Sequence, residues 1–280
     1  MGEAAEQWRG LVEGRLAEME RLQTGRGDVG GAFWDKRWRR IAKGPMASAE
    51  GDPMLSRLRR AVGRSGRATV LDVGSGPGRF AVAIAPRARQ VTAVDPSTKM
   101  LALLRRRARE AGAGNVRTVH GYWQDVEVEP ADVVLCSHVV TLVADVVPFV
   151  RKLDAAARKR VLLYVGGYAV DGVLDPFWRR FHGRPRHPGA SWVDALAVLE
   201  EQGIDASVEV VELPTWSRHE TLADAVEAYR DQLVLPRTKD AGDALTRLLD
   251  PWLQRRGGYL RAPFRTQPAA ILSWVPSGTP

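Results

Sequence analysis

Residues 70–80 read VLDVGSGPGRF, and this stretch decides the fold. An apolar run that contains Asp72 is followed by glycines at positions 74, 76 and 78. Glycine accepts positive φ angles and lets the backbone approach a ligand closely. A helix that begins at such a turn presents free N–H groups to polar or anionic atoms. The stretch therefore predicts a buried strand, a ligand-binding turn and the start of a helix.

Strands and helices alternate on both sides of this turn. Apolar runs predict strands at 68–73, 90–95, 116–121, 131–137 and 159–165, and helices are predicted at 78–88, 97–112 and 145–156. Further along the chain, helices are predicted at 191–203, 220–234 and 239–255, and strands at 207–213 and 269–275. Apolar strands that alternate with helices are typical of a doubly wound α/β fold, in which a mostly parallel sheet has helices on both faces.

Two segments lie outside this alternation. An amphipathic helix is expected at 4–23 and a short helix at 54–62, so residues 1–62 are interpreted as an N-terminal helical segment. The α/β domain then occupies 63–280 and carries a helical insertion at about 218–262. The arginine-rich and aromatic stretch at 177–189, FWRRFHGRPRHPG, is interpreted as a loop beyond the fifth strand that contains His182 and His187.

Composition sets broad limits on function. The 280 residues carry a net charge of +8, which attracts phosphate, but only six of the 41 basic residues are lysine, and this bias can reflect a GC-rich genome. No apolar run is long enough to span a membrane, and the N-terminus lacks the pattern of a secretory signal. With a single cysteine, Cys136, we expect a cytoplasmic protein without disulfides, membrane contact or a metal site.

The spacing of the glycines narrows the choice of ligand. The dinucleotide pattern G-x-G-x-x-G requires glycine at position 79, where this chain has Arg79, which weakens an NAD-dependent oxidoreductase. Asp95 ends the second strand, seventeen residues after Gly78. A carboxylate at that position can accept both hydroxyls of a ribose.

With LDVGSGPG at 71–78, VTAVDPS at 91–97 and ADVVLCSHVV at 131–140, the chain resembles the class I S-adenosylmethionine-dependent methyltransferases over roughly residues 68–165. The resemblance implies a seven-stranded sheet whose last strand is antiparallel. It also implies S-adenosylmethionine as cofactor and S-adenosylhomocysteine as product. The cofactor residues that it implies are Asp72 for the amino group, the turn Gly74, Ser75, Gly76 and Gly78, Asp95 for the ribose, and Pro96, Ser97, Met100 and Ser137 around them.

One segment departs from the family. After the third strand the family has a Gly-Asp-small stretch that contacts adenine, and here the chain reads HGYWQDV. Either Gln124 or Asp125 can make that contact, and we favour Asp125. Trp123 or Tyr122 can stack on the ring, or both can be ordinary packing residues.

The methyl acceptor is less well defined. His138 follows the fourth strand and is the first choice for a general base, although it can equally line the cofactor or cap the next helix. Tyr164 and Tyr168 flank the end of the fifth strand. The N-terminal segment, as a lid, and the insertion are expected to build the acceptor pocket with the aromatic residues Trp34, Trp38, Tyr229, Trp252 and Tyr259, or simply to cover the sheet.

The sequence thus predicts direct transfer of a methyl group to oxygen or nitrogen of a small molecule, by a monomer or homodimer. Cys136 is interpreted as a buried strand residue, because Leu135 stands where a cytosine-attacking cysteine would follow proline. Nucleic acid is a possible but not favoured partner. The alternatives are methylation of ribosomal RNA or protein, and non-enzymatic binding of S-adenosylmethionine.

Overall fold

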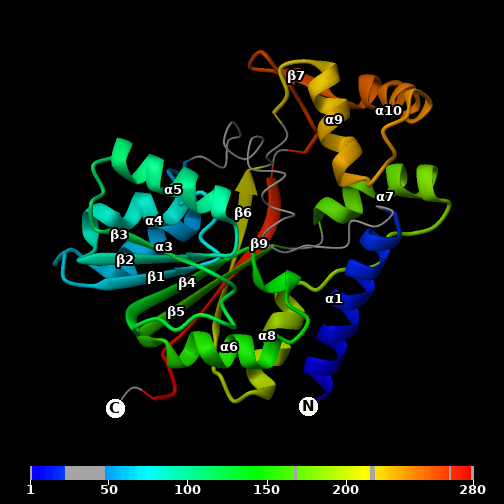
Figure 1. The fold of residues 1–280 in the computed structure, drawn as a ribbon. Helices are drawn as coiled ribbons and strands as arrows, with labels where there is room; N and C mark the ends of the chain where they lie inside the picture. Colours follow the sequence, from blue (N-terminus) through cyan, green and yellow to red (C-terminus); the bar gives the residue numbers. More distant parts are fainter. Residues whose placement is uncertain (1, 23–47, 167–168, 215–217, 265, 279–280) are drawn as a thin grey trace.

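The computed structural model describes residues 2–22, 48–166, 169–214, 218–264 and 266–278. Its centre is a seven-stranded sheet in the order β3-β2-β1-β4-β5-β9-β6 (Figure 1). The strands are β1 Thr69–Val73, β2 Gln90–Asp95, β3 Val116–His120, β4 Ala131–Ser137, β5 Ala157–Gly166, β6 Ser207–Pro214 and β9 Thr266–Trp274. Strands β1 to β5 are parallel, and β9 is antiparallel to both of its neighbours, β5 and β6. The predicted sheet with an antiparallel last strand is confirmed.

Helices cover both faces of the sheet (Figure 1). One face carries α3 Pro53–Val62, α4 Arg79–Ile84 and α5 Thr98–Glu110, and the other carries α6 Val146–Ala155, α8 Trp192–Glu201 and α1 Glu3–Leu22. Short 3-10 turns lie at Ala85–Arg87 and Val140–Leu142. Strand β4 serves both layers, because Val133 and Leu135 pack toward α3 and α4 while Val134 and Cys136 pack toward α6. Burial on both sides explains why the central strands are almost continuously apolar.

A lobe that was expected to contain two helices is larger in the structure. It consists of α7 Ala169–His182, α9 Leu222–Gln232, α10 Lys239–Trp252 and a hairpin of β7 Gln254–Arg256 and β8 Tyr259–Arg261. These elements share a hydrophobic core of their own, separate from the two layers on the sheet. The interpretation of 177–189 as a loop was wrong for its first half, which is the end of α7. Leu174, Phe177, Trp178 and Phe181 recur at helical spacing and bury that face of α7 against the lobe, despite Pro176.

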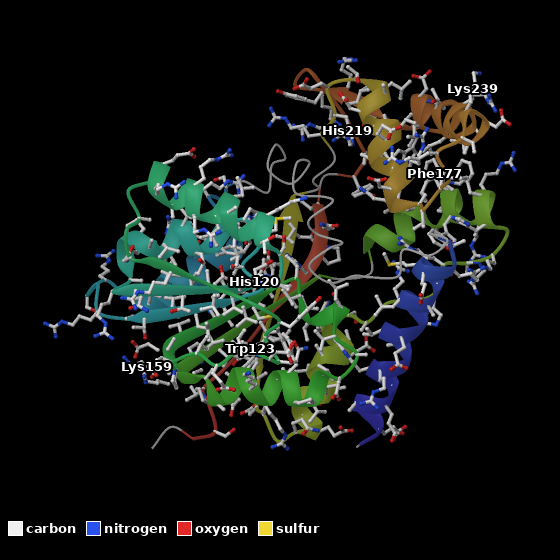
Figure 2. All side chains as sticks on the ribbon, in the orientation of Figure 1. His120, Trp123, Lys159, Phe177, His219 and Lys239 are labelled. Atoms are coloured by element: carbon white, nitrogen blue, oxygen red, sulfur yellow. The ribbon has the colours of Figure 1, made fainter. Side chains whose placement is uncertain are left out.

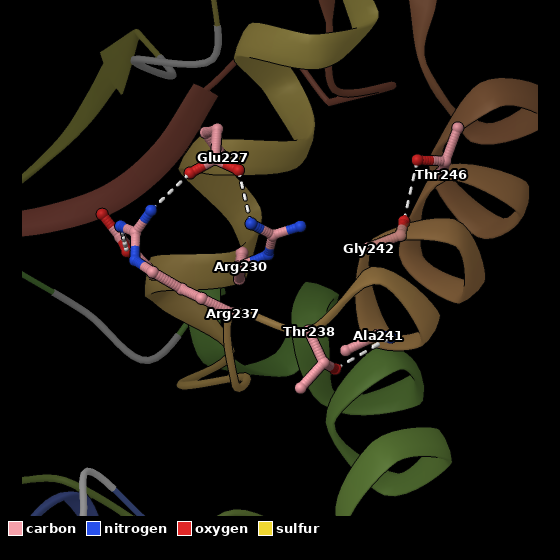
Figure 3. Close-up of polar contacts among 8 residues, drawn as sticks. Glu227, Arg230, Arg237, Thr238, Ala241, Gly242 and Thr246 are labelled. Atoms are coloured by element: carbon pink, nitrogen blue, oxygen red, sulfur yellow. Dashed lines mark hydrogen bonds and ion pairs between the residues drawn. The ribbon is translucent and has the colours of Figure 1, made fainter.

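Polar contacts fix the connection between α9 and α10, two of the three helices of the lobe (Figure 3). The Glu227 carboxylate pairs with Arg230 at 2.5 Å and with Arg237 at 2.8 Å, and so joins α9 to the segment that leads into α10. Thr238 caps α10 by accepting a hydrogen bond from the amide of Ala241. The connection between the helices is therefore fixed by side chains at both of its ends.

Helix α1 is held to the connector between α7 and α8. The buried Glu18 carboxylate pairs with Arg184 at 2.8 Å and accepts a hydrogen bond from the amide of His187 at 3.0 Å. Arg15 donates to the carbonyl of His187, and the Trp8 indole donates to the carbonyl of Val143. The second half of the 177–189 stretch thus anchors α1. Within the described ranges, we find no helix with the length and apolar character needed to cross a bilayer.

We expect Glu18→Gln to destabilise the protein by about 1–2 kcal/mol, because the substitution removes the charge from a buried carboxylate paired with a partly exposed arginine. Urea unfolding followed by tryptophan fluorescence measures the difference. Glu20→Gln, on the exposed face of the same helix, is the matched control. Equal stability of the two variants would show that the Glu18–Arg184 pair does not hold α1.

Candidate functional site

A cavity of about 200 Å³ opens at the carboxyl ends of β1, β2 and β4. In open α/β sheets this edge is where ligands bind. The residues that line it are Asp72, Gly74, Ser75, Gly76, Pro77, Arg79, Phe80, Asp95, Pro96, Met100, Ser137, His138, Val139 and Leu142. Most of the residues expected from the sequence to contact a cofactor therefore surround one space.

The glycine turn forms one wall of the cavity. Gly74, Gly76 and Gly78 all have positive φ angles, between 52° and 83°, which residues with a Cβ adopt only under strain. A Cβ on Gly74 would overlap the side chain of Val139, and one on Gly78 would lie 2.6 Å from Cγ of Leu104. At Gly76 the same position has no heavy atom within 4 Å. Gly76 is therefore the point at which the turn leaves backbone open to a ligand.

Asp95 fixes the turn to the next strand. One carboxylate oxygen accepts the amide of Gly76 at 2.8 Å, and the other accepts the amide of Ser97 at 2.8 Å. Ser97 in turn caps α5, because its hydroxyl accepts the amide of Met100. The cap places the Met100 side chain in the cavity wall. One buried carboxylate thus sets the relative position of the turn, Pro96 and the first turn of α5.

Asp72 is buried beneath the glycine turn. Burial raises the pKa of Asp72 to about 7, the neighbouring Asp95 carboxylate adds to the increase, and a hydrogen bond from the amide of Ala81 opposes it. Near neutral pH the carboxyl is therefore divided between its protonated and ionised forms. A cation that binds beside it would favour the ionised form.

His138 adopts an unusual backbone conformation at the cavity wall. Its φ is 57°, its amide donates to the carbonyl of Tyr164, and its ring lies 4.6 Å from the Tyr164 ring. Non-glycine residues with positive φ concentrate at functional sites. Burial, followed by the positive charge of Arg79, lowers the pKa of His138 to about 4. The imidazole is thus neutral at physiological pH and is a weaker base than an ordinary histidine.

Five of the lining residues were not expected from the sequence, namely Pro77, Arg79, Phe80, Val139 and Leu142. Arg79 was considered only as a departure from the dinucleotide pattern. In the structure it pairs with Asp52 at 2.6 Å, with both side chains almost fully buried, and it donates to the carbonyl of Ser48. Asp52 also caps α3 through the amide of Met54. The available signal was the position of Arg79 directly after the turn, but its partner lies 27 residues away.

The adenine contacts expected at 122–125 are not at the cavity. The Trp123 ring is 4% exposed, lies on the α6 side of the sheet (Figure 2) and has the Lys152 ammonium 5.0 Å from its centroid. Gln124 and Asp125 are exposed, and neither lines the cavity. The Trp123 ring packs in the core with Phe149 and Val150, which agrees with the packing alternative, and stacking on a ligand remains an untested prediction. Tyr122 is 48% exposed.

The aromatic residues expected around the acceptor are divided among several places. Trp34, Trp38 and Tyr168 lie outside the described residues. Tyr229 is buried in the lobe, where its ring meets those of Trp252 and His219, and Tyr259 lies in the hairpin under Arg218. Phe177 and His219 both lie in this lobe, away from Trp123 (Figure 2). His182 Nε2 forms a hydrogen bond with the carbonyl of Leu233, and its ring lies 4.2 Å from the Trp178 ring, tilted by 39°.

Asp72 and His138, whose pKa values are shifted in opposite directions, should have opposite effects on how stability changes with pH. Between about pH 4 and 7 folded Asp72 holds a proton that the unfolded chain releases, so Asp72 makes the free energy of unfolding fall as pH rises. Between about pH 4 and 6.5 unfolded His138 holds a proton that the folded chain lacks, so His138 makes it rise. In Asp72→Asn the contribution of His138 remains, so the free energy of unfolding should rise with pH across this range. In His138→Asn the contribution of Asp72 remains, so the free energy of unfolding should fall. Urea unfolding across this range checks both signs, and identical slopes in the two variants contradict the assignment.

Comparisons with known proteins agree with this geometry. Residues 70–159 match the family model described as a methyltransferase domain. An uncharacterised protein of Haemophilus influenzae is 36% identical over 148 residues, a match that covers 51% of this chain and 53% of that protein. The chain thus aligns with about half the length of this curated relative.

Solved structures extend the likeness in fold. A SAM-dependent methyltransferase from Geobacter sulfurreducens, in complex with S-adenosylhomocysteine, superposes with a TM-score of 0.53 at 18% identity, covering 86% of this chain and 98% of that one. Magnesium protoporphyrin IX methyltransferase from Synechocystis, with bound SAH, gives a TM-score of 0.52 at 16% identity, covering 93% and 94%. The resemblance drawn from the sequence is confirmed in family domain and fold: residues 70–159 match a methyltransferase domain, and these solved methyltransferases share the fold.

Proposed function

We propose that the protein transfers a methyl group from S-adenosylmethionine to oxygen or nitrogen of a small-molecule acceptor by direct displacement. The observation that carries this proposal is the cavity at the carboxyl edge, where the glycine turn, Asp95 and Met100 meet within the segment that matches the methyltransferase domain. The bound cofactor supplies an activated sulfonium methyl group. The chain's own residues bind it, orient it and exclude water.

The chemistry of the cavity fits this cofactor. Asp95 is 6% exposed, lines the cavity and accepts the amides of Gly76 and Ser97, and we propose its carboxylate as the acceptor for the two hydroxyls of a ribose. Met100, Val139 and Leu142 supply apolar surface for the adenine and the thioether chain. Asp72 supplies a carboxyl for the amino group. Ser75, Gly76, Pro96 and Ser137 complete the contacts that we propose, whereas nothing in the placement of Gln124 or Asp125 supports an adenine contact.

The acceptor would approach from the lobe side. Strand β5 ends at Gly166 just before α7, and the chain leaves the sheet after β6 and returns at β9. Because β5 and β6 run in the same direction, both excursions leave from the edge that holds the cavity. This topology supports the lobe as a wall of the acceptor pocket, with residues 1–62 as its second part.

The neutral imidazole of His138 is proposed as the proton acceptor. It faces the cavity, and its low pKa leaves the ring unprotonated at neutral pH. A base of this strength assists only a modest transfer of charge, because efficiency is greatest when the pKa lies near the working pH. We therefore favour acceptors whose nucleophilic atom is already partly activated.

The single cysteine supports a cytoplasmic location.

The central test is calorimetric titration with S-adenosylmethionine, S-adenosylhomocysteine and NAD. Binding of the first two alone supports the proposal, and binding of NAD alone overturns it. A panel of small-molecule acceptors, ribosomal RNA and protein substrates then separates the acceptor classes by production of S-adenosylhomocysteine. A cofactor complex that methylates nothing in the panel favours the binding-protein alternative.

Asp95→Ala should weaken binding of S-adenosylhomocysteine by at least about tenfold, because it removes charge-assisted hydrogen bonds and loosens the turn at Gly76. Asp132→Ala is the matched control, since Asp132 accepts the amide of Thr69 near the opposite edge of the sheet. Asp125→Ala should leave the affinity within about twofold if the exposed carboxylate makes no ligand contact. Unchanged affinity in Asp95→Ala contradicts the ribose assignment.

His138→Asn should lower kcat for the acceptor found in the panel by about 10²-fold, the lower end of what a general base contributes, while the affinity for S-adenosylhomocysteine stays nearly constant. Asparagine is chosen because it tolerates the positive φ at this position. A matching loss of cofactor affinity would instead indicate a wall residue. An unchanged kcat removes the base from the mechanism.

A further inference from the structure

A second cavity, of about 330 Å³, lies between α3 and the strands β5, β9 and β6. Arg160 lies near the start of β5, Ser207 is the first residue of β6, and Ser273 is near the end of the antiparallel β9. These positions place the cavity near the amino edge of the parallel strands. It therefore lies toward the end of the sheet away from the glycine turn, and no residue lines both cavities.

Hydrogen-bond donors dominate the lining. Three guanidinium groups and two hydroxyls face one carboxylate, Glu209, which is paired with Arg57. Among the described residues, neither Arg60 nor Arg160 has a carboxylate partner. The cavity therefore carries two positive charges that no acid within it neutralises. An anion is the ligand that such a lining attracts.

The fold brings these donors to one place. Arg57 and Arg60 are three residues apart on α3, so both project from the same face of the helix. Ser207 and Ser273 are directly paired across β6 and β9, which sets their Cβ atoms about 4.5–5.5 Å apart. Leu162, the partner of Ser273 on β5, gives the cavity an apolar side beside them.

We propose that this cavity binds a small molecule that carries a phosphate group. Arginine forks match the geometry of phosphate oxygens, and serine hydroxyls donate to the same atoms. The volume is that of a small-ligand site, and the donors surround one hollow rather than following a stripe as a nucleic-acid backbone requires. The ligand would act as an effector or be a substrate part held apart from the methyl donor, so the proposal goes beyond methyl transfer.

The test is calorimetric titration of the full chain with sodium pyrophosphate at about 0.15 M salt. The double variant Arg60→Gln, Arg160→Gln should lose at least about tenfold in affinity. The matched control is Arg64→Gln, Arg67→Gln, which removes two exposed arginines from the turn after α3 and should stay within about twofold of the unchanged protein. Ser273→Ala provides a second, gentler variant and should lose several-fold.

Two further measurements separate this site from the cofactor cavity and from nucleic acid. Asp95→Ala should bind pyrophosphate as the unchanged protein does, whatever becomes of its affinity for S-adenosylhomocysteine. A single-stranded RNA oligonucleotide should bind more weakly than pyrophosphate. The proposal is overturned if pyrophosphate does not bind or if RNA alone binds. It is also overturned if the Arg60→Gln, Arg160→Gln variant and the Arg64→Gln, Arg67→Gln control lose affinity for pyrophosphate equally.

Discussion

The carboxylate of Asp95 is the constraint on which the candidate site depends. It accepts the amides of Gly76 and Ser97, and so joins the turn after β1 to the turn after β2. Both turns are short and neither could keep its position without a partner for its amides. Strand β2 accepts two further amides of the turn, because Gly74 and Ser75 both donate hydrogen bonds to the carbonyl of Val94. A charge used in this way positions the cavity before any ligand arrives, which lowers the cost of ordering on binding.

The same burial that shapes the cavity moves its two titrating groups in opposite directions. Desolvation disfavours the charged form in each case, so it raises the pKa of Asp72 and lowers that of His138. Asp95 increases the first shift and Arg79 increases the second. At neutral pH the site therefore carries the negative charge of Asp95, a partly ionised Asp72, a neutral His138 and the mutually balanced Arg79–Asp52 pair. Such an environment suits a ligand that brings its own positive charge.

Much of this arrangement could be predicted from the sequence because it is local. The strand, the three glycines and the helix start lie within residues 70–80, and Asp95 follows at the end of the next strand. The capping of α5 by Ser97 is also local, because the Ser97 hydroxyl accepts the amide of Met100, three residues further along the chain. The Arg79–Asp52 pair and the contact between the His138 and Tyr164 rings could not be predicted, because each joins residues that are 26 or more positions apart. Contacts of that kind depend on the packed sheet.

Two placements could not be read from the local sequence. The sequence left Trp123 open between stacking on adenine and packing, and the short turn at 123–125 directs its ring to the core beneath α6. Helix α7 was not predicted over 177–182, because arginines, a glycine and Pro176 are untypical of a helix interior. Its apolar residues at helical spacing are explained by their packing in the core shared with α9 and α10. In both cases tertiary packing overrides the local pattern.

The separate core of the lobe has an evolutionary consequence. Leu174, Tyr229 and Leu249 belong to a core separate from the two cores on the sheet, so most of the internal contacts of the lobe do not involve the strands. Substitutions can accumulate there without disturbing the strands that carry Asp72 and Asp95. A chain built in this way can change the surface of its lobe while the half that matches the methyltransferase domain stays under unchanged selection, and relatives are expected to diverge first in the lobe.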